Sequence, residues 1–256
     1  MIDVELAKKE FDKYVSNFNP NEGRIKLKIE HIKRVAEMSK KLAMNLNLDE
    51  EYIKLAEIIG LFHDIGRFKQ VELFNTFSDK DSVNHAEFSV KTLFDDNLIA
   101  NFNIDEKYHQ IIKSAVLNHN KPRIDSALTG DELLFAKIIR DADKLDIFYT
   151  ICEYDFESIF WYPEFDCERI SDIIINQFIN DHSINYPDIK TNADVILCFY
   201  AYIYDFNFDF SLGFLKTKDY LETFAGRVKQ KFSSEIVGQQ VDEILKISND
   251  YLNSIF

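Results

Sequence analysis

The sequence predicts an all-α fold, and three observations lead to this prediction. Of the 256 residues, 46% are hydrophobic and 29% are charged, which excludes a disordered chain, a collagen-like repeat and a bare coiled coil. The chain has only 7 Gly and 4 Pro, which leaves few turn residues for a fold rich in β-strands. Apolar residues also recur at helical spacing. At this length we expect an all-α helical bundle with an additional C-terminal helical subdomain.

Five helices are expected in the first 150 residues. They run over Lys26 to Asn45, from Asp49 to His63-Asp64-Ile65-Gly66, from Ser82 onward, from about Asp105 to Asn118, and from Asp131 to Asp146. Asp49 and Ser82 are the expected N-caps, and Gly66 can take the left-handed position that often ends a helix. Four histidines fall at the ends or in the first turns of these helices: His31, His63, His85 and His119. This placement suggests that several helix ends converge on one point.

The chain changes in character beyond residue 150, where aromatic and acidic residues become dense. We expect three or four further helices there, including Asp194 to Phe206 and Asp219 to Phe232, and a closing stretch from Glu235 to Phe256. Basic minus acidic residues gives 22 − 26 = −4 for residues 1–150 and 8 − 18 = −10 for residues 151–256. The sequence thus predicts a first domain over residues 1–150 and an acidic, aromatic-rich helical extension over residues 151–256 packed on it.

Charge and cysteine content restrict the partners and the location of the protein. A net charge of −14 repels the phosphate backbone, so no nucleic-acid polymer is expected as a partner. Cys152, Cys167 and Cys198 match no metal knuckle or redox pair, and we expect them to be reduced and mostly buried. The N-terminal residues do not resemble a signal peptide, and no stretch approaches the roughly 18 apolar residues of a membrane span. We therefore expect a cytoplasmic protein without a membrane partner, and a homo-oligomer stays open.

Histidine and aspartate residues supply a candidate metal site. A borderline divalent ion accepts imidazole nitrogens and carboxylate oxygens together. One such set would leave coordination positions for water and substrate: His31, His63, Asp64 and Asp143. Adding His85 and His119 gives enough ligands for a second ion, and Asp64 is the natural bridge because each of its oxygens can bind one ion. Two ions a few ångströms apart can activate a water and neutralise charge on a phosphoryl oxygen.

These residues also follow the pattern of a known family, which has a His on one helix, a His-Asp pair ending the next, and a distant Asp. Here they are His31, His63-Asp64 and Asp143, within Leu61-Phe62-His63-Asp64-Ile65-Gly66-Arg67 and Asp141-Ala142-Asp143-Lys144-Leu145-Asp146. Over residues 25–150 the chain resembles the HD-domain superfamily of metal-dependent phosphohydrolases, which implies an HD-domain helical bundle. Family members with two metals carry further histidines between the pair and the last Asp, where this chain has His85 and His119.

The two-metal subset is similar to the cyclic-dinucleotide phosphodiesterases of the HD-GYP type. In those enzymes a Lys after the His-Asp-Ile-Gly sequence contacts phosphate, and Arg67 stands at that place here. Where they have adjacent histidines this chain has Asn118-His119, and the Gly-Tyr-Pro signature is missing. The resemblance therefore implies the chemistry of the superfamily and leaves the substrate open.

The implied activity is hydrolysis of a small anionic phosphoester, such as a nucleotide or cyclic nucleotide, by a metal-activated water. One or two divalent ions would serve as cofactors, with Mn, Fe, Ni or Co expected and Mg as a further candidate. Asp64 would bridge the ions and orient the water, and Arg67 would act in catalysis and bind two phosphate oxygens. Lys144 would offer the phosphate a point charge, or else form a salt bridge with Asp141 or Asp146.

Two other functions stay open at this point. A His/Asp ligand set in this order also looks like the di-iron oxygenases that share the HD fold and use O₂ on a C–H bond of an alcohol or phosphonate. The other alternative is a non-catalytic module that binds a nucleotide or a metal without turnover.

Overall fold

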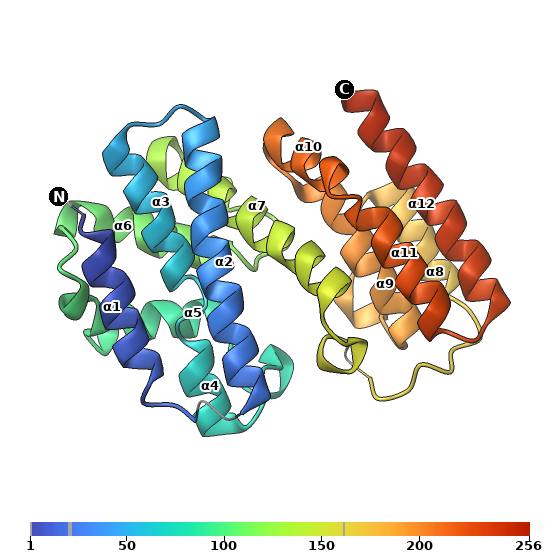
Figure 1. The fold of residues 1–256 in the computed structure, drawn as a ribbon, viewed down its shortest axis with the longest axis horizontal. Helices are drawn as coiled ribbons and strands as arrows, with labels where there is room; N and C mark the ends of the chain where they lie inside the picture. The colour runs from blue at the N-terminus through green and yellow to red at the C-terminus, as the bar shows by residue number, and fades with distance from the viewer. Residues whose placement is uncertain (1, 20–21, 161) are drawn as a thin grey trace. The chain divides into compact units, whose positions relative to one another are not determined.

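The computed structural model describes residues 2–19, 22–160 and 162–256, and these residues form helices, turns and loops without a β-strand (Figure 1). The predicted all-α fold is therefore confirmed. The chain divides into two compact units, Met1–Asp146 and Ile147–Phe256, and their boundary falls inside helix α7 (Gly130–Glu153). No helix in the described ranges combines the length and the apolar character that crossing a membrane requires.

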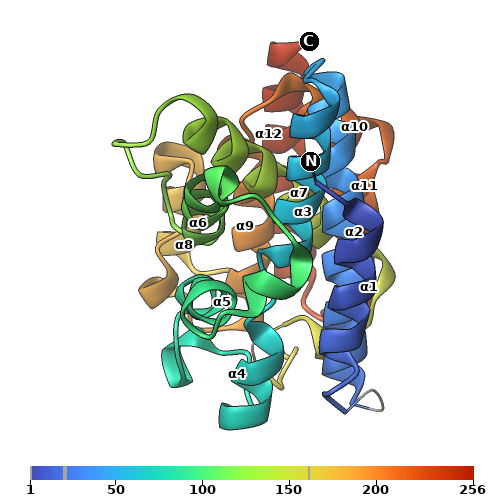
Figure 2. The same cartoon turned by 90° about the vertical axis from the view of Figure 1, so that its left-hand side faces the viewer.

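The helices of the first unit that precede α7 are α1 (Val4–Val15), α2 (Gly23–Asn45), α3 (Glu50–Phe62), α4 (Arg67–Phe74), α5 (His85–Val90) and α6 (His109–Asn118). Short 3₁₀ turns at Asp79–Asp81, Leu98–Phe102 and Glu106–Tyr108, and a π turn at Lys91–Asp95, connect them. As Figure 2 shows, α5 lies between α4 and α6, and it contacts both. Helix α4 begins three residues after Asp64, so the His-Asp pair lies in the short turn between α3 and α4.

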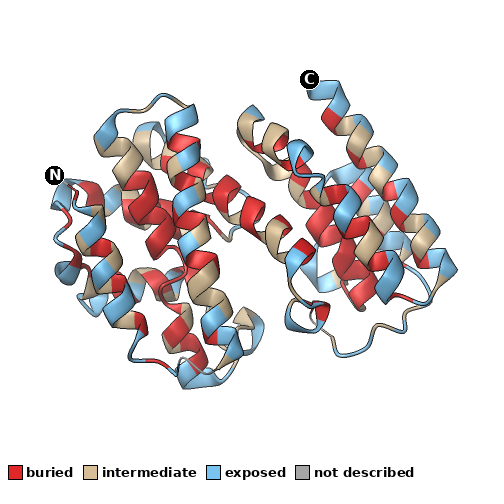
Figure 3. Cartoon of the chain, viewed as in Figure 1, coloured by how far each residue is buried: buried red, intermediate tan, exposed pale blue. Residues whose placement is uncertain are grey.

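Helix α3 is the central helix of the first unit. Asp49 is its N-cap as predicted, because its carboxylate accepts a hydrogen bond from the Tyr52 backbone N–H at 2.8 Å. The helix is buried continuously from Leu55 to Phe62 (Figure 3), as expected for an apolar helix enclosed by others. It ends directly at the His-Asp pair, so a buried helix delivers that pair to the interior of the unit.

Close packing of α2 against α3 depends on Gly60. A Cβ atom at this position would lie 2.5 Å from the Ala36 Cα and 2.9 Å from its backbone nitrogen, both on α2. No residue with a side chain fits there unless one of the helices moves. The absence of a side chain therefore lets α2 approach α3, one turn before the point where α3 ends at His63.

Three local predictions are wrong in detail. Gly66 is right-handed (φ −71°) and is required for another reason, because a Cβ there would lie 2.6 Å from the Ser89 backbone nitrogen on α5. The N-cap of α5 is Asn84, whose side chain accepts from two backbone N–H groups, whereas Ser82 belongs to the preceding turn. Helix α6 begins at His109, since Asp105 caps the 3₁₀ turn Glu106–Tyr108 instead.

The helices of the second unit that follow α7 are α8 (Asp172–Asn176), α9 (Asn192–Ala201), α10 (Asp209–Thr217), α11 (Tyr220–Lys231) and α12 (Glu235–Ile255). The predicted helix Asp194 to Phe206 is α9 followed by the 3₁₀ turn Tyr202–Asp205. A capping box of Thr191 and Asp194 begins α9, which is buried throughout. Aromatic residues fill the core of this unit, with Phe160 contacting both Phe199 and Phe232. The aromatic enrichment of the sequence therefore corresponds to a packed core.

The cysteines are free, as predicted. Cys152 and Cys198 are buried and Cys167 is half-buried. Burial raises the pKa of Cys152 to about 12 and raises that of Cys198 as well. These two thiols therefore act as packing residues.

Candidate metal centre

The six predicted metal ligands all lie in the first unit. His31 is within α2 and Asp143 within α7, His63 and Asp64 follow α3, His85 is the first residue of α5, and His119 follows α6. Two groups have ligand atoms within 4.8 Å of one another: His31, His63 and Asp64, and Asp64, His85 and His119. We call them the first and the second ligand group. Asp64 is common to both.

Two of the histidines are held by the carbonyl groups at the ends of helices. His63 Nδ1 lies 2.7 Å from the Gly60 carbonyl oxygen, and His119 Nδ1 lies 2.7 Å from the Val116 carbonyl oxygen. Because a carbonyl oxygen only accepts, each Nδ1 carries the proton and each Nε2 presents a lone pair. The C-terminal ends of α3 and α6 also carry partial negative charge, which favours a cation beside them.

The other two histidines are held by carboxylates that are themselves held by arginines. His31 Nδ1 lies 2.7 Å from Asp146 Oδ2, and Arg34 Nε donates to Asp146 Oδ1 at 2.6 Å. His85 Nδ1 lies 2.6 Å from Asp79 Oδ2, and Arg67 Nη1 donates to Asp79 Oδ1 at 2.9 Å. We call these His–Asp–Arg chains the first relay, His31–Asp146–Arg34, and the second relay, His85–Asp79–Arg67. A carboxylate behind an imidazole orients the ring and makes its other nitrogen a stronger metal ligand.

The four Nε2 atoms face the centre in pairs. His31 Nε2 is 3.3 Å from His63 Nε2, and His85 Nε2 is 3.0 Å from His119 Nε2. Asp64 lies between the pairs. Its Oδ2 is 3.6 Å from both nitrogens of the first pair, and its Oδ1 is 3.6 Å from both nitrogens of the second pair. One carboxylate thus offers a separate oxygen to each pair.

Asp143 joins the first ligand group. Its Oδ1 lies 3.2 Å from His31 Nε2 and 3.7 Å from His63 Nε2. Burial favours the neutral acid, but hydrogen bonding and charge from the surrounding histidines hold the pKa of Asp143 below its usual range. The first group can therefore supply two imidazoles and two carboxylates.

In each pair the two Nε2 atoms face each other, and their lone pairs repel unless a proton or a metal ion lies between them. Burial and Lys28 both disfavour a charged His31, but hydrogen bonds to the surrounding carboxylates outweigh them and raise its pKa to about 10. Burial lowers the pKa of His63 to about 3, so His31 alone holds the proton of this pair. Burial, followed by the charge of Arg67, lowers the pKa of His85 to about 4. His63 and His85 are thus neutral imidazoles and Asp64 and Asp143 are anionic carboxylates, which are the forms that bind metal ions.

A divalent metal ion fits this arrangement. Asp64 Oδ1 is buried without a hydrogen-bond partner, although the carboxylate is anionic. Its pKa lies well below the usual range because Lys28 and the histidines outweigh the effect of burial. Arg67 Nε lies 3.6 Å from this oxygen, too far for a hydrogen bond. An anionic oxygen that accepts no hydrogen bond in the interior is costly unless a cation binds it closely. Such a cation would also bind the imidazole nitrogens that lie beside this oxygen.

Sequence reasoning missed several residues that position the ligands. Asp146 holds His31, and Asp79 holds His85. The only sequence signal for Asp146 is that it lies three residues after Asp143, on the same face of the predicted helix. Arg140 on α7 is buried and donates to the carbonyls of Asn118 at 2.8 Å and Lys121. Arg140 therefore donates hydrogen bonds to backbone carbonyls at the C-terminal end of α6, beside His119, where the helix itself offers no donor.

Three cations lie near the centre with different contacts. Lys28 Nζ is 2.8 Å from Asp64 Oδ2, and its side chain is 16% exposed. Arg67 Nη1 donates to Gln70 Oε1, to the Phe77 carbonyl and to Asp79. Lys144 is buried on α7. Of these, Lys28 is the one that sequence reasoning missed, although it lies one helical turn before His31.

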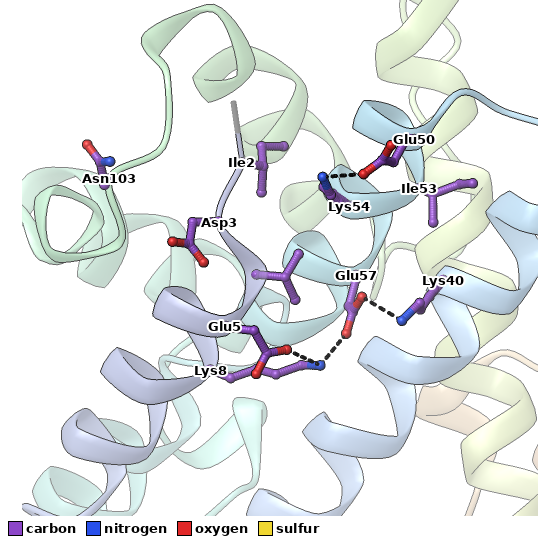
Figure 4. Close-up of a pocket in the computed structure, with 11 residues that line it drawn as sticks. Ile2, Asp3, Glu5, Lys8, Lys40, Glu50, Ile53, Lys54, Glu57 and Asn103 are labelled. Atoms are coloured by element: carbon purple, nitrogen blue, oxygen red, sulfur yellow. Dashed lines mark hydrogen bonds and ion pairs between the residues drawn. The ribbon is translucent and has the colours of Figure 1, made fainter.

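A separate cavity of about 670 Å³ lies among α1, α2 and α3 (Figure 4). Buried Glu57 projects into it and pairs with Lys8 Nζ at 2.6 Å and Lys40 Nζ at 3.4 Å. None of the six predicted ligands lines this cavity. Each of the three lysines that line it pairs with a glutamate of the same cavity, so it is a feature of helix packing separate from the metal centre.

Comparison with known families assigns the first unit. Residues 29–147 match the family model of the HD domain. Residues 29–147 therefore form an HD domain, and the resemblance predicted from the sequence is confirmed. HD domains bind divalent metal ions, and members of this superfamily are commonly metal-dependent phosphohydrolases. Searches of curated proteins and of solved structures returned no match.

Proposed function

We propose that the protein is a phosphohydrolase with a two-metal centre, in which water cleaves a small anionic phosphoester. The observation that carries the proposal is Asp64, which offers one oxygen to each of two pairs of histidine Nε2 atoms. The HD-domain match supports the same chemistry. Nucleotides and cyclic nucleotides are the first substrates to consider.

The residues divide between the two ions through their oxygen and nitrogen atoms. His31, His63, Asp143 and Asp64 Oδ2 would hold one ion, and His85, His119 and Asp64 Oδ1 would hold the other. Bound divalent ions lower the pKa of a coordinated water and neutralise charge on the phosphoryl oxygens. Four imidazoles suit Mn, Fe, Co or Ni better than Mg, which prefers oxygen ligands.

Lys28 supplies the positive charge for the substrate in this proposal. Its ammonium lies beside Asp64, at the centre of the ligand set, and is partly exposed. An ammonium in this place can contact a phosphoryl oxygen while Asp64 binds the ions. Lys144 stays a predicted substrate contact. Arg67 commits its Nη1 to three protein acceptors, which supports a different role for it.

The test is metal analysis followed by a substrate screen. The protein purified without chelator should contain transition metal. The protein is then reloaded with Mn²⁺, Co²⁺, Ni²⁺ or Fe²⁺ and tested on a panel of phosphomonoesters, nucleotides and cyclic mono- and dinucleotides. It should release phosphate from at least one monoester or nucleotide, or hydrolyse the phosphodiester ring of at least one cyclic nucleotide. Absence of turnover across the panel by fully loaded protein would contradict the proposal.

One observation also favours an oxygenase as a second candidate. Four histidines and two aspartates, one of which is shared by both ligand groups, form a ligand set that iron accepts. Anaerobic purification, iron quantification and an O₂-consumption assay on small alcohols and phosphonates separate the two reactions. Turnover of a phosphoester with Mn²⁺ in iron-free protein would exclude the oxygenase, and ligand binding without any turnover would instead indicate a binding module.

A further inference from the structure

We infer that Arg67 and Asp79 are positioning residues of the second ligand group, and that this group binds its ion more weakly than the first group because a loop holds it in place. The inference rests on the proposed two-metal centre. It assigns Arg67 to the protein scaffold, where sequence reasoning placed it on the substrate.

Asp79 fixes both the ring and the backbone of His85. Asp79 Oδ2 accepts from His85 Nδ1 at 2.6 Å and from the His85 backbone N–H at 3.2 Å. Its other oxygen, Oδ1, accepts from Arg67 Nη1 at 2.9 Å and from Gln70 Nε2 at 3.2 Å. One carboxylate therefore connects the first residue of α5 to two side chains of α4.

The same two side chains of α4 fasten the segment that leads to His85. Arg67 Nη1 donates to the Phe77 carbonyl at 2.7 Å, and Gln70 Nε2 donates to Ser82 Oγ at 2.8 Å and to the Val83 carbonyl at 3.1 Å. Gln70 is fully buried. Residues 77–85 thus depend on Arg67 and Gln70 for their conformation, since few backbone hydrogen bonds of a regular helix are available there.

The first relay is built on a more stable scaffold. The Asp146 side chain is 4% exposed and lies on the 24-residue helix α7, whereas the Asp79 side chain is 31% exposed and lies in a three-residue turn. Short, exposed elements open locally at lower free energy than long buried helices. Every opening of the turn releases His85, so part of the free energy of binding an ion is spent on ordering the loop.

The number of ligands points in the same direction. The first group includes the carboxylate of Asp143 in addition to Asp64, and the second group has only the shared carboxylate with two imidazoles. Fewer anionic ligands and a less rigid support both weaken the binding of a divalent ion. The protein should therefore fill its two sites in two steps.

The contacts of Arg67 make a substrate role and a positioning role separable by experiment. An arginine that only binds phosphate leaves metal binding unchanged when it is replaced, and KM rises. An arginine that holds Asp79 controls the second ion, and its loss lowers the affinity for that ion before any substrate is added.

The experiment is titration of Mn²⁺ into the metal-free full chain by calorimetry, with stoichiometry checked by native mass spectrometry. The wild type should bind two ions in two steps. Asp79→Asn and Arg67→Met should weaken the second step about 10- to 100-fold and leave the first step within a factor of about two. Arg67→Lys should restore part of the loss. Lys69→Met is the matched control, because Lys69 is on the same helix and pairs with exposed Asp96 instead.

Circular dichroism and thermal unfolding establish that each variant is folded. The inference is overturned if both steps are unchanged in Asp79→Asn and Arg67→Met, if both steps weaken equally, or if the wild type binds a single ion. A wild type that binds two ions in two steps and hydrolyses nothing would contradict the proposed function while leaving this inference intact.

Discussion

The two ligand groups of the metal centre use the same chemistry on different scaffolds. Each group contains one histidine held by a helix-end carbonyl and one histidine held by an Asp–Arg pair. In the first group the Asp–Arg pair comes from the long helices α2 and α7, and in the second it comes from a turn and the start of α4. Ligand identity alone therefore does not set the properties of a site, because the elements behind the ligands decide how firmly they are held.

Lys28 adds a second difference between the groups. Its ammonium contacts Asp64 Oδ2, the oxygen of the first group, while Oδ1 faces the second group without a hydrogen bond. A positive charge at 2.8 Å lowers the charge that Oδ2 can offer to a metal ion. Arg67 Nε lies 3.6 Å from Oδ1, so an opposing charge stands beside both oxygens and is nearer to the oxygen of the first group.

Asp64→Asn should have the largest effect, because it removes the one ligand that the two groups share. An amide cannot offer an anionic oxygen to both ions, so we expect both ions to be lost and kcat to fall by at least about a thousandfold. Elemental analysis and turnover with the best substrate measure the two effects. Asp166→Asn, at an exposed position of the second unit, is the control. Retention of one ion at wild-type affinity would show that the groups do not depend on a common bridge.

Asp146→Asn tests the first relay and should give the reverse of the Asp79→Asn result. Loss of the carboxylate behind His31 should weaken the first ion about 10- to 100-fold, with the second step of the Mn²⁺ titration changed less. Since Asp146 also pairs with Arg34 in a buried place, the thermal stability of the metal-free protein should fall as well. Selective weakening of the second step would mean that the assignment of ligands to the two groups is wrong.

The sequence predicts the ligands of this centre better than their supports. His63 and Asp64 are adjacent, and helical periodicity shows that α3 ends at them, so their placement follows from local sequence. Asp146 lies 115 residues from His31 and 112 residues from Arg34 in the sequence. No local sequence pattern predicts a contact across that separation. Tertiary packing decides such contacts, and it is not contained in periodicity.

Gly66 and the N-cap of α5 show a second limit of prediction from the sequence. The sequence places a glycine after the His-Asp pair, and a left-handed cap is the usual explanation. The actual reason is the approach of Ser89 from a helix that begins 19 residues later, which only a folded structure reveals. Ser82 and Asn84 are both good caps by composition, and the choice between them follows from Ser82 being used by Gln70.

Lys28→Met separates the two effects proposed for Lys28, which have opposite signs. Without the ammonium, Asp64 Oδ2 carries more charge for an ion, so the first step of the Mn²⁺ titration should strengthen a few-fold. Substrate loses a charged contact, so KM should rise about tenfold, the lower end expected for one partly exposed charged hydrogen bond. Lys33→Met, on the same helix with exposed Asp12 as its partner, is the control. Weaker binding of the first ion would instead assign Lys28 to the support of Asp64.

Asn84→Ala should give the smallest effect and tests how far the second group depends on its short helix. Asn84 accepts from the backbone N–H groups of Ala86 and Glu87, and removal of such a cap costs about 1 kcal/mol. Because α5 has only six residues, we expect this loss to free His85 more often and to weaken the second ion about fivefold, less than Asp79→Asn does. Ser234→Ala removes the cap of α12 in the second unit and should lower stability without changing either step of the Mn²⁺ titration. If Asn84→Ala weakened the first ion instead, the two groups would not be supported independently, and the contrast between a rigid group and a loop-held group would fail.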